Sequence, residues 1–582
     1  MRREASVVNK KVCSFPILFA LLALLIGTCA VVFPASAQAA PTSTGSITVS
    51  GTVASSYDAY QIFSANVVDG DSDAKIATDL AWVSDAVRDA ALPVLHSAGM
   101  PNSQTTAQEA AEWLNTDSHL TSALSAQLAR SLQSSGAESV ALNAGTAAEL
   151  SCGYWLIVVK DDAIAQGEAG TAPIMALVGG SAVTVKPKAA TPKVQKHVLE
   201  DGTAAWQKAA DATVADDLYW RLSATVPAGL TAYDTYTVRF VDTMSAGLEP
   251  SKVAASMHVY VAAGADGGFD AVACEGGRAG TEPAKGWTDI TAQCKVSVEG
   301  NSFTVRTGDL IAALGGADAF SAGARVVAVY NAPLNSACNH GIAKGNPNEV
   351  YLCYPRSPFA DQSGDAGFTR TPSDDACAYT WDLALTKRGS DGDKPLAGAV
   401  LSIADDRGRT LATDGTWDAE GKATVTTGED GRVSVSGVDS GKLEVRELKA
   451  PKGYTAFEGT RSVTVKAEGL DVDQVAAAKP KLTIAAESPL RADSADGSTG
   501  SLEASLINTP TGTPPSITTG GFMPSTGDMA MYAAAAAAVA GAALIVVALL
   551  VKRGGGSHKE WLAAPQRAGR DVAKQMLRHR QI

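Results

Sequence analysis

Residues 443–454 read Leu443-Glu-Val-Arg-Glu-Leu-Lys-Ala-Pro-Lys-Gly-Tyr454, an alternating run that ends in a turn sequence. Successive side chains of a β-strand point to opposite faces, so Leu443, Val445 and Glu447 share one face. The two apolar members mark that face as the one that lies against a core. The stretch therefore predicts a β-strand that carries a glutamate into the interior.

Two further predicted strands place a polar residue on a core-facing set: Leu383, Leu385, then Lys387, and Leu502, Ala504, Leu506, then Asn508. Lysine and glutamate are almost never fully buried unless they are paired. We therefore expect Lys387, Glu447 and Asn508 to meet in one core. An apolar site lowers the pKa of a lysine and raises that of a glutamate, so both can be neutral.

This arrangement predicts a covalent bond between side chains. A neutral amine is a nucleophile, and a protonated carboxyl can donate a hydrogen bond to an amide carbonyl and shuttle protons. Attack of Lys387 on the Asn508 amide would release ammonia and leave an isopeptide bond, with Glu447 as the catalytic acid. Short strands at roughly ten-residue spacing across residues 377–509 favour a β-sandwich.

With Pro395-Leu-Ala-Gly-Ala-Val-Leu401, the quoted stretch resembles the CnaB-type domains of Gram-positive pilins and adhesins. The resemblance implies an Ig-like sandwich and assigns the bond to Lys387, Glu447 and Asn508.

Residues 188–376 repeat the pattern with an aspartate in place of the glutamate. The shared faces are Val194, Lys196 and Val198, then Val238, Phe240 and Asp242, then Asn348, Val350 and Leu352. This region resembles the CnaA-like middle domain of major pilins, which implies a bond from Lys196 to Asn348 assisted by Asp242. Asn346 has the same parity as Asn348, so the sequence leaves both asparagines open.

Residues 40–187 mix two periodicities. Alternating runs at 46–50, 57–63 and 153–159 predict strands, whereas the stretch from Thr78 to Leu132 is helical in period, with a capping box at Thr106 and Glu109. We expect an α+β domain here. The predicted fold class is mainly β, with tandem CnaA- and CnaB-type sandwiches after this mixed domain and one C-terminal transmembrane helix.

The C-terminal end has the order of a surface anchor. Residues 530–551 carry no charge and are long enough to span a bilayer, and the basic tail 552–582 indicates the cytoplasmic side. Just before the span, within a linker over 510–529, stands a pentapeptide made of Met523, Pro524, Ser525, Thr526 and Gly527.

This order resembles the sorting signal of Gram-positive surface proteins, although the family usually has leucine where Met523 stands. In that family a sortase cleaves the bond that here joins Thr526 to Gly527. It then transfers the threonine carbonyl to an amine.

Residues 1–39 predict a signal peptide, with basic residues, an apolar run and an Ala-x-Ala site, and a retained membrane anchor as the alternative. Export permits disulfide bonds. Six cysteines remain beyond this segment and allow many pairings. Proximity in sequence favours two of them, Cys274 with Cys294 and Cys353 with Cys377.

The formal charge of −13 argues against nucleic-acid binding, because the basic residues cluster only near the two membrane-proximal ends. The sequence also has no hydrolase motif and no metal-binding helix of the His-Glu-x-x-His type. It predicts no cofactor and no metal.

Val183-Thr-Val-Lys-Pro-Lys188 resembles the pilin motif of shaft subunits, whose last lysine attacks the sortase thioester. Lys186 stands where that family usually has tyrosine. Lys186 and Lys193 are near rivals of Lys188 for the role.

These features together predict the shaft subunit of a sortase-assembled pilus, joined through Thr526 to Lys188 of the next copy and anchored to the cell wall. The implied partners are sortase, further copies, minor pilins and peptidoglycan. The chain is an enzyme only towards itself. The alternatives are a monomeric wall-anchored adhesin, a minor or basal pilin, and a wall-anchored enzyme.

Overall fold

The computed structural model describes residues 44–71, 74–116, 118–187 and 190–512. The predicted signal peptide, sorting motif, membrane span and basic tail lie outside the described residues, as does Lys188. Within the described ranges, no helix has the length and apolar character needed to cross a membrane.

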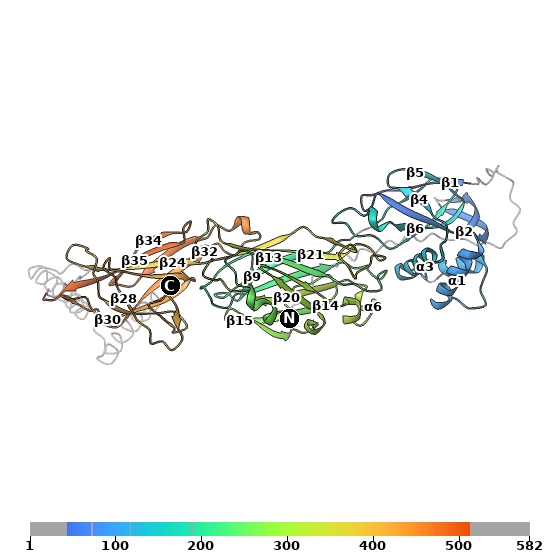
Figure 1. Ribbon diagram of the computed structural model, residues 1–582. Coiled ribbons are helices and arrows are strands. Elements are labelled where there is room, and N and C mark those ends of the chain that lie inside the picture. Colours follow the sequence, from blue (N-terminus) through green and yellow to red (C-terminus); the bar gives the residue numbers. More distant parts are fainter. Residues whose placement is uncertain (1–43, 72–73, 117, 188–189, 513–582) are drawn as a thin grey trace, which may run out of the picture. The chain divides into compact units, whose positions relative to one another are not determined.

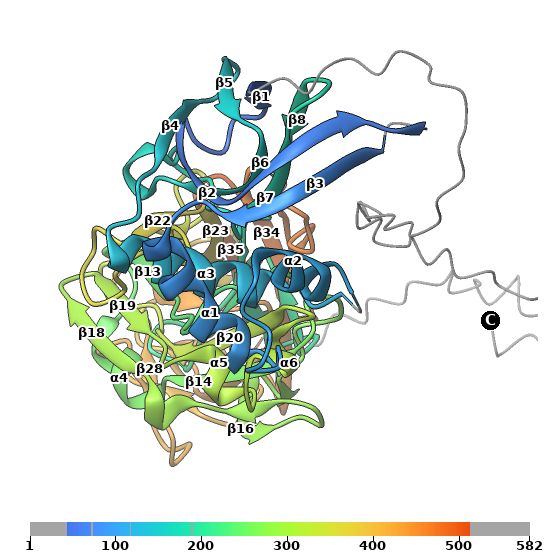
Figure 2. The ribbon, with the colours of Figure 1, turned by 90° about the vertical axis from the view of Figure 1, so that its right-hand side faces the viewer.

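The first region, residues 44–187, combines the helices α1 (Asp85–Ser97), α2 (Ala107–Asn115) and α3 (Ser122–Ser135) with two sheets. Figure 2 shows the three helices together on one side of β2 and β3, and Phe63, Leu95 and Leu128 share the core between them. The strands are β1 (Thr44–Val49), β2 (Ser56–Asp69), β3 (Lys75–Trp82), β4 (Val140–Asn143), β5 (Ala147–Ser151), β6 (Gly153–Val159), β7 (Ile174–Val178) and β8 (Val183–Val185).

The capping box is confirmed at the start of α2. The Glu109 amide donates to Thr106 Oγ1 over 3.2 Å, and the Thr106 amide donates to Glu109 Oε2 over 3.0 Å. The helical prediction was wrong over residues 78–82, which belong to β3. There the backbone groups pair with β2, and helix begins only after the N-cap Ser84.

The second region is a sandwich of two large sheets. One has the order β10-β9-β12-β20-β14-β17, and the other has the order β11-β23-β21-β13-β19-β18 with β22 beside β21. Its strands are β9 (Lys193–Glu200), β10 (Ala205–Gln207), β11 (Ala209–Asp211), β12 (Tyr219–Val226), β13 (Arg239–Met244), β14 (His258–Ala263), β17 (Thr288–Asp289), β18 (Lys295–Glu299), β19 (Ser302–Arg306), β20 (Ala324–Asn331), β21 (Asn346–Pro355), β22 (Phe368–Arg370) and β23 (Asp374–Tyr379).

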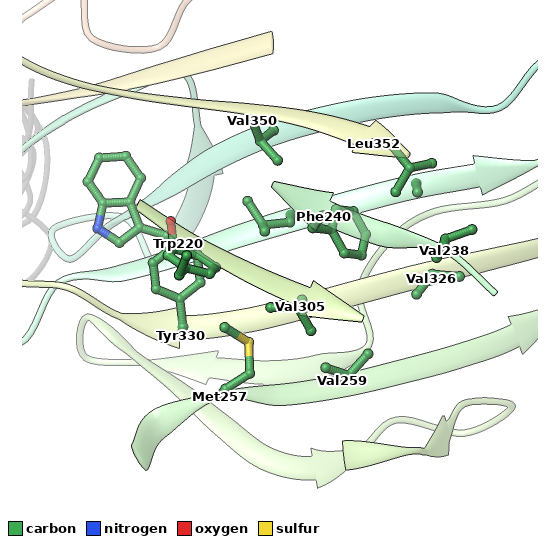
Figure 3. Close-up of a cluster of buried hydrophobic side chains, with 14 of the residues drawn as sticks. Trp220, Val238, Phe240, Met257, Val259, Val305, Val326, Tyr330, Val350 and Leu352 are labelled. Carbon is green, nitrogen blue, oxygen red and sulfur yellow. The ribbon is translucent and has the colours of Figure 1, made fainter. Parts of the chain in front are cut away.

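The core of this sandwich lies between the two sheets. Figure 3 shows Trp220 and Tyr330 from one sheet among Phe240, Val350 and Leu352 from the other. Smaller elements decorate it: a hairpin of β15 (Val272–Glu275) and β16 (Arg278–Pro283), and the short helices α4 (Val253–Ser256), α5 (Leu310–Ala313) and α6 (Ala317–Phe320).

The third region is a second sandwich with its own core. Its sheets have the orders β29-β24-β35-β31, with β34 beside β35, and β27-β26-β25-β30-β32-β33, with β28 beside β25. The strands are β24 (Trp381–Gly389), β25 (Val400–Ala404), β26 (Thr410–Leu411), β27 (Trp417–Asp418), β28 (Val425–Thr426), β29 (Arg432–Val438), β30 (Gly441–Lys449), β31 (Tyr454–Thr455), β32 (Thr460–Glu468), β33 (Lys481–Ala486), β34 (Leu490–Asp496) and β35 (Ser501–Pro510). The protein is thus mainly β and contains several β-sandwich regions.

The predicted disulfide pairs are wrong, because all four of these cysteines are free thiols. In the pairing of β21 with β23, Cys377 lies opposite Pro347, six residues along β21 from Cys353. At about 3.3 Å per residue this separation is far beyond the reach of a disulfide. Cys274 lies in the β15–β16 hairpin, whereas the Cys294 thiol donates to the Ile290 carbonyl.

Candidate functional site

The third region brings its three predicted polar residues together in the core. β24 and β35 are parallel neighbours in one sheet, with Lys387 opposite Leu506 and Gly389 opposite Asn508, and Figure 1 shows them side by side. β30 belongs to the facing sheet and supplies Glu447. β24 and β30 alternate as predicted, and β35 does so except at the buried Ser505; Lys387, Glu447 and Asn508 are all buried.

Glu447 contacts both of the other residues through one oxygen. Its Oε1 lies 3.5 Å from Lys387 Nζ and accepts a 2.8 Å hydrogen bond from Asn508 Nδ2. Its Oε2 accepts a 3.1 Å hydrogen bond from the Phe457 amide, which fixes the carboxyl group in place. Within the described part of the chain, the buried Asn508 Oδ1 has no hydrogen-bond partner.

Burial lowers the pKa of Lys387 to about 8, although the nearby Glu447 favours the charged amine. A usable fraction of this amine is therefore neutral near pH 7. The Lys387 amine also donates to the Leu506 carbonyl over 3.3 Å, which holds it beside the strand that carries Asn508.

The second region holds a similar group between its two sheets. Lys196 comes from β9, and Asp242 and Asn348 come from β13 and β21 of the facing sheet; all three are completely buried. Lys196 Nζ contacts Asp242 Oδ2 directly. Its backbone amide donates to Asp374 over 2.6 Å, and its carbonyl accepts a 2.9 Å hydrogen bond from the Lys208 amine, so β9 is anchored at this residue.

Tyr330 of β20 connects this group. Its hydroxyl accepts hydrogen bonds from Lys196 Nζ (2.9 Å) and Asn348 Nδ2 (2.8 Å) and donates one to Asp242 Oδ2 (3.2 Å). Asp242 Oδ1 and Asn348 Oδ1 are buried with no hydrogen-bond partner among the described residues. The site thus contains an amine, an acid and an amide joined through a phenol.

The two candidate asparagines have different surroundings. The Asn346 amide nitrogen donates to the Asn339 and Ala378 carbonyls, and its oxygen accepts from the Asn339 amide. Its side chain therefore holds the loop before β21, whereas Asn348 reaches Tyr330 and, through it, Lys196. This geometry favours Asn348 as the reacting residue.

Burial shifts both ionisable groups of the second region towards their neutral forms. It lowers the pKa of Lys196 to about 8 and raises the pKa of Asp242 to about 6, in each case against the attraction of the partner charge. The Lys196 amine also lies 5.5 Å from the centre of the Trp220 ring. Because of these pKa shifts, the neutral form of the Lys196 amine and the protonated form of the Asp242 carboxyl can both be populated near neutral pH.

Sequence reasoning missed two contributors to these sites. The Phe457 amide is a backbone group, which leaves no signal in a side-chain pattern. Tyr330 lies on β20, whose residues from Val327 to Asn331 are buried on both faces. Parity marks a core-facing polar residue only where the other face is exposed, so β20 offers no contrast that could have identified Tyr330.

The residues predicted to link subunits lie largely outside the described ranges. Thr526 and Lys188 are not described, and neither is the rest of the sorting motif. Lys186, the nearest rival of Lys188, is exposed and directly follows β8.

Comparison with known proteins finds pilin-like relatives. Residues 382–479 match the model of the SpaA family, described as a prealbumin-like fold domain. The trypsin-resistant surface T6 protein of Streptococcus pyogenes serotype M6 is 30% identical over 143 residues, which are 23% of this chain and 24% of that protein. The match thus spans about a quarter of that relative's length.

Three solved structures are similar over most of the chain. The T6 backbone pilin of serotype M6 Streptococcus pyogenes has 16% identity and a TM-score of 0.43, covering 81% of this chain and 98% of that one. The major pilin SpaD of Corynebacterium diphtheriae has 15% identity and a TM-score of 0.39, with coverages of 81% and 98%. BcpA, the major pilin subunit of Bacillus cereus, has 11% identity and a TM-score of 0.36, with coverages of 80% and 99%.

Proposed function

We propose that this chain is the backbone subunit of a sortase-assembled pilus and that each of its two sandwich regions carries an internal isopeptide bond. The observation that carries the proposal is the repetition, in two regions of one chain, of a buried lysine beside a buried acid and a buried asparagine. Burying a lysine and an acid costs several kcal/mol in desolvation, so the same buried pair beside an asparagine in two regions calls for a physical reason. We propose that the reason is an internal covalent bond that resists tension.

The bond in the third region joins Lys387 to Asn508. The neutral Lys387 amine attacks Cγ of Asn508, and Glu447 moves a proton from the attacking nitrogen to the departing Nδ2. The new bond is Nζ–Cγ, the broken bond is Cγ–Nδ2, and ammonia leaves. A single Glu447 oxygen near both nitrogens supports this assignment.

The bond in the second region joins Lys196 to Asn348 with Asp242 as the acid. Its support is the direct contact between Lys196 and Asp242 and the position of Asn348 on the same hydroxyl. Tandem mass spectrometry of a digest tests the choice of asparagine, because the cross-linked peptide must contain Asn348 modified and Asn346 unmodified. A cross-link at Asn346, or at neither residue, would contradict it.

Assembly and anchoring follow from the sorting signal. A sortase would cleave after Thr526 and transfer its carbonyl to Lys188 of another copy, and the last copy would be joined to peptidoglycan. The T6 relative is named for trypsin resistance and for its place on the cell surface, and we extend both properties to this chain. Minor pilins and a surface ligand are the remaining proposed partners.

An immunoblot of cell-wall extracts tests the proposal. A polymer joined by amide bonds survives boiling in detergent, so we expect a ladder of high-mass bands that collapses to one band in a strain without the assembling sortase. A variant with Thr526→Ala should likewise give no ladder. A single wall-released band in the parent strain would instead indicate the monomeric adhesin.

A further inference from the structure

The two proposed bond-forming sites differ in how the acid reaches the amide. In the third region, Asn508 Nδ2 donates directly to Glu447 Oε1, the same oxygen that faces Lys387. In the second region, the Asn348 amide nitrogen donates to the Tyr330 hydroxyl, and that hydroxyl donates to Asp242 Oδ2. Aspartate is one methylene shorter than glutamate, and a phenol occupies the position between acid and amide.

Tyr330 is placed firmly enough to fill that position. It is completely buried, and its ring packs edge-on against Phe303 with the centroids 4.8 Å apart. Burial holds the pKa of its hydroxyl well above the usual value, so the phenol keeps its proton at neutral pH. A neutral phenol can accept one proton and donate another at the same time.

We propose that Tyr330 is a catalytic residue that relays a proton from Asp242 to the departing nitrogen of Asn348. This inference rests on the proposed Lys196–Asn348 bond. The hydroxyl touches both reacting nitrogens, at 2.9 Å from Lys196 Nζ and 2.8 Å from Asn348 Nδ2. Among the described residues, the Tyr330 hydroxyl provides the hydrogen-bonded path from Asp242 to the leaving nitrogen.

The proton transfers in the proposed reaction of Lys196 with Asn348 balance. Lys196 first gives a proton to Asp242, and the neutral amine then attacks Cγ of Asn348. Asp242 passes its proton to the Tyr330 oxygen while Tyr330 gives its own proton to Nδ2, and the attacking nitrogen returns a proton to Asp242. The Cγ–Nδ2 bond breaks and ammonia leaves. Asp242 is then protonated and Tyr330 is neutral, as both were when the amine attacked.

The test compares single and double variants of the full chain made by cell-free translation and stopped with acid at set times. Digestion and mass spectrometry give the fraction of Lys196 joined to Asn348 and, in the same sample, of Lys387 joined to Asn508. For Tyr330→Phe we expect the first bond to form at least about 100-fold more slowly, as for loss of a general acid–base group. The second bond should form at the parent rate.

Two further variants make the result specific. Tyr233→Phe removes another buried hydroxyl of the second region, one without a hydrogen-bond partner among the described residues, and should bond at the parent rate. Combining Tyr330→Phe with Asp242→Glu lengthens the acid, so it should restore most of the rate. A rate for Tyr330→Phe equal to that of Tyr233→Phe, or a double variant as slow as Tyr330→Phe, would overturn the relay. A parent chain without the Lys196–Asn348 bond would instead overturn the proposed bond itself.

Discussion

Glu447 makes three contacts within its site. One oxygen lies between the Lys387 amine and the Asn508 amide, and the other is held by the Phe457 backbone. These contacts hold the carboxyl group in place between the two groups that the proposed reaction would join. At the scale of single residues, this makes Glu447 the position where the proposed chemistry is most easily removed.

Changing Glu447 to alanine should abolish the proposed bond of the third region. Without the carboxyl group, neither loss of a proton from Lys387 nor protonation of the leaving nitrogen is assisted. The intact mass should then exceed that of the parent by one ammonia, after allowance for the substitution itself, and trypsin should cleave the region more readily. Glu447→Gln keeps the size of the side chain and should also fail to form the bond. This variant separates the loss of the carboxyl group from the loss of side-chain volume. Bond formation in either variant at the parent rate would contradict the assignment.

The rate of bond formation in the second region should be nearly flat between about pH 6 and pH 8. The neutral fraction of Lys196 rises with pH up to its pKa of about 8, and the protonated fraction of Asp242 falls above its pKa of about 6. Between these values the two changes cancel, whereas below pH 6 and above pH 8 the rate falls roughly tenfold per pH unit. Time courses of cross-linked peptide at a series of pH values check this. A rate that keeps rising above pH 8 would mean that a protonated Asp242 is not needed.

At the scale of strands, the alternation of side chains identified candidate site residues in those strands that have one buried face and one exposed face. β24 alternates in this way from Trp381 to Gly389, so Lys387 was recognisable as a core-facing lysine. Most of β20 is buried on both faces, so alternation could not identify Tyr330 as a residue that faces the site. Alternation puts Asn346 and Asn348 on the same face, and their hydrogen bonds distinguish them: Asn346 bonds to Asn339 and Ala378, whereas Asn348 bonds to Tyr330.

Other elements depended on partners that lie far away in sequence. Residues 78–82 are helical in period but form β3 because β2 offers an edge with which they pair. The cysteine pairs failed for the same reason, since closeness in sequence does not give register within a sheet, and Cys353 and Cys377 lie at different levels of their sheet.

The proposed bond of the third region should stabilise that region strongly, because it would join its first and last long strands. Lys387 lies on β24 and Asn508 on β35, so the bond closes a loop of on the order of 100 residues, for which a cross-link contributes about 4–5 kcal/mol by loop entropy. Asn508→Ala should lower the unfolding free energy of the region by about that amount. Hydrogen exchange of β24 and β35 amides should accelerate accordingly. Asn348→Ala is the control, since it should leave exchange in these two strands unchanged.

At the scale of the whole molecule, the positions of the two bonds suit a subunit that is pulled between Lys188 and Thr526. The pulled part of the chain would contain the second and third regions, whereas residues 44–187 precede Lys188. In the third region the force would enter at β24 and leave at β35, and these parallel neighbours are the strands that the bond joins. Tension would then pass through the cross-link, and the strands that lie between β24 and β35 in the sequence would carry little force.

The linking lysine is the part of this scheme that a conservative substitution can decide. An acceptor amine must be exposed and partly deprotonated inside the sortase complex, which the buried Lys196 and Lys387 cannot satisfy. Lys188→Arg keeps the charge but, with a guanidinium pKa above about 12, removes the usable nucleophile. We expect cells with this variant to show only wall-anchored monomer on an immunoblot. Lys186→Arg is the matched control, two residues away and exposed in the parent, and should leave the ladder intact. The reverse pair of results would make Lys186 the linking residue and would mean that the motif is shifted by two positions.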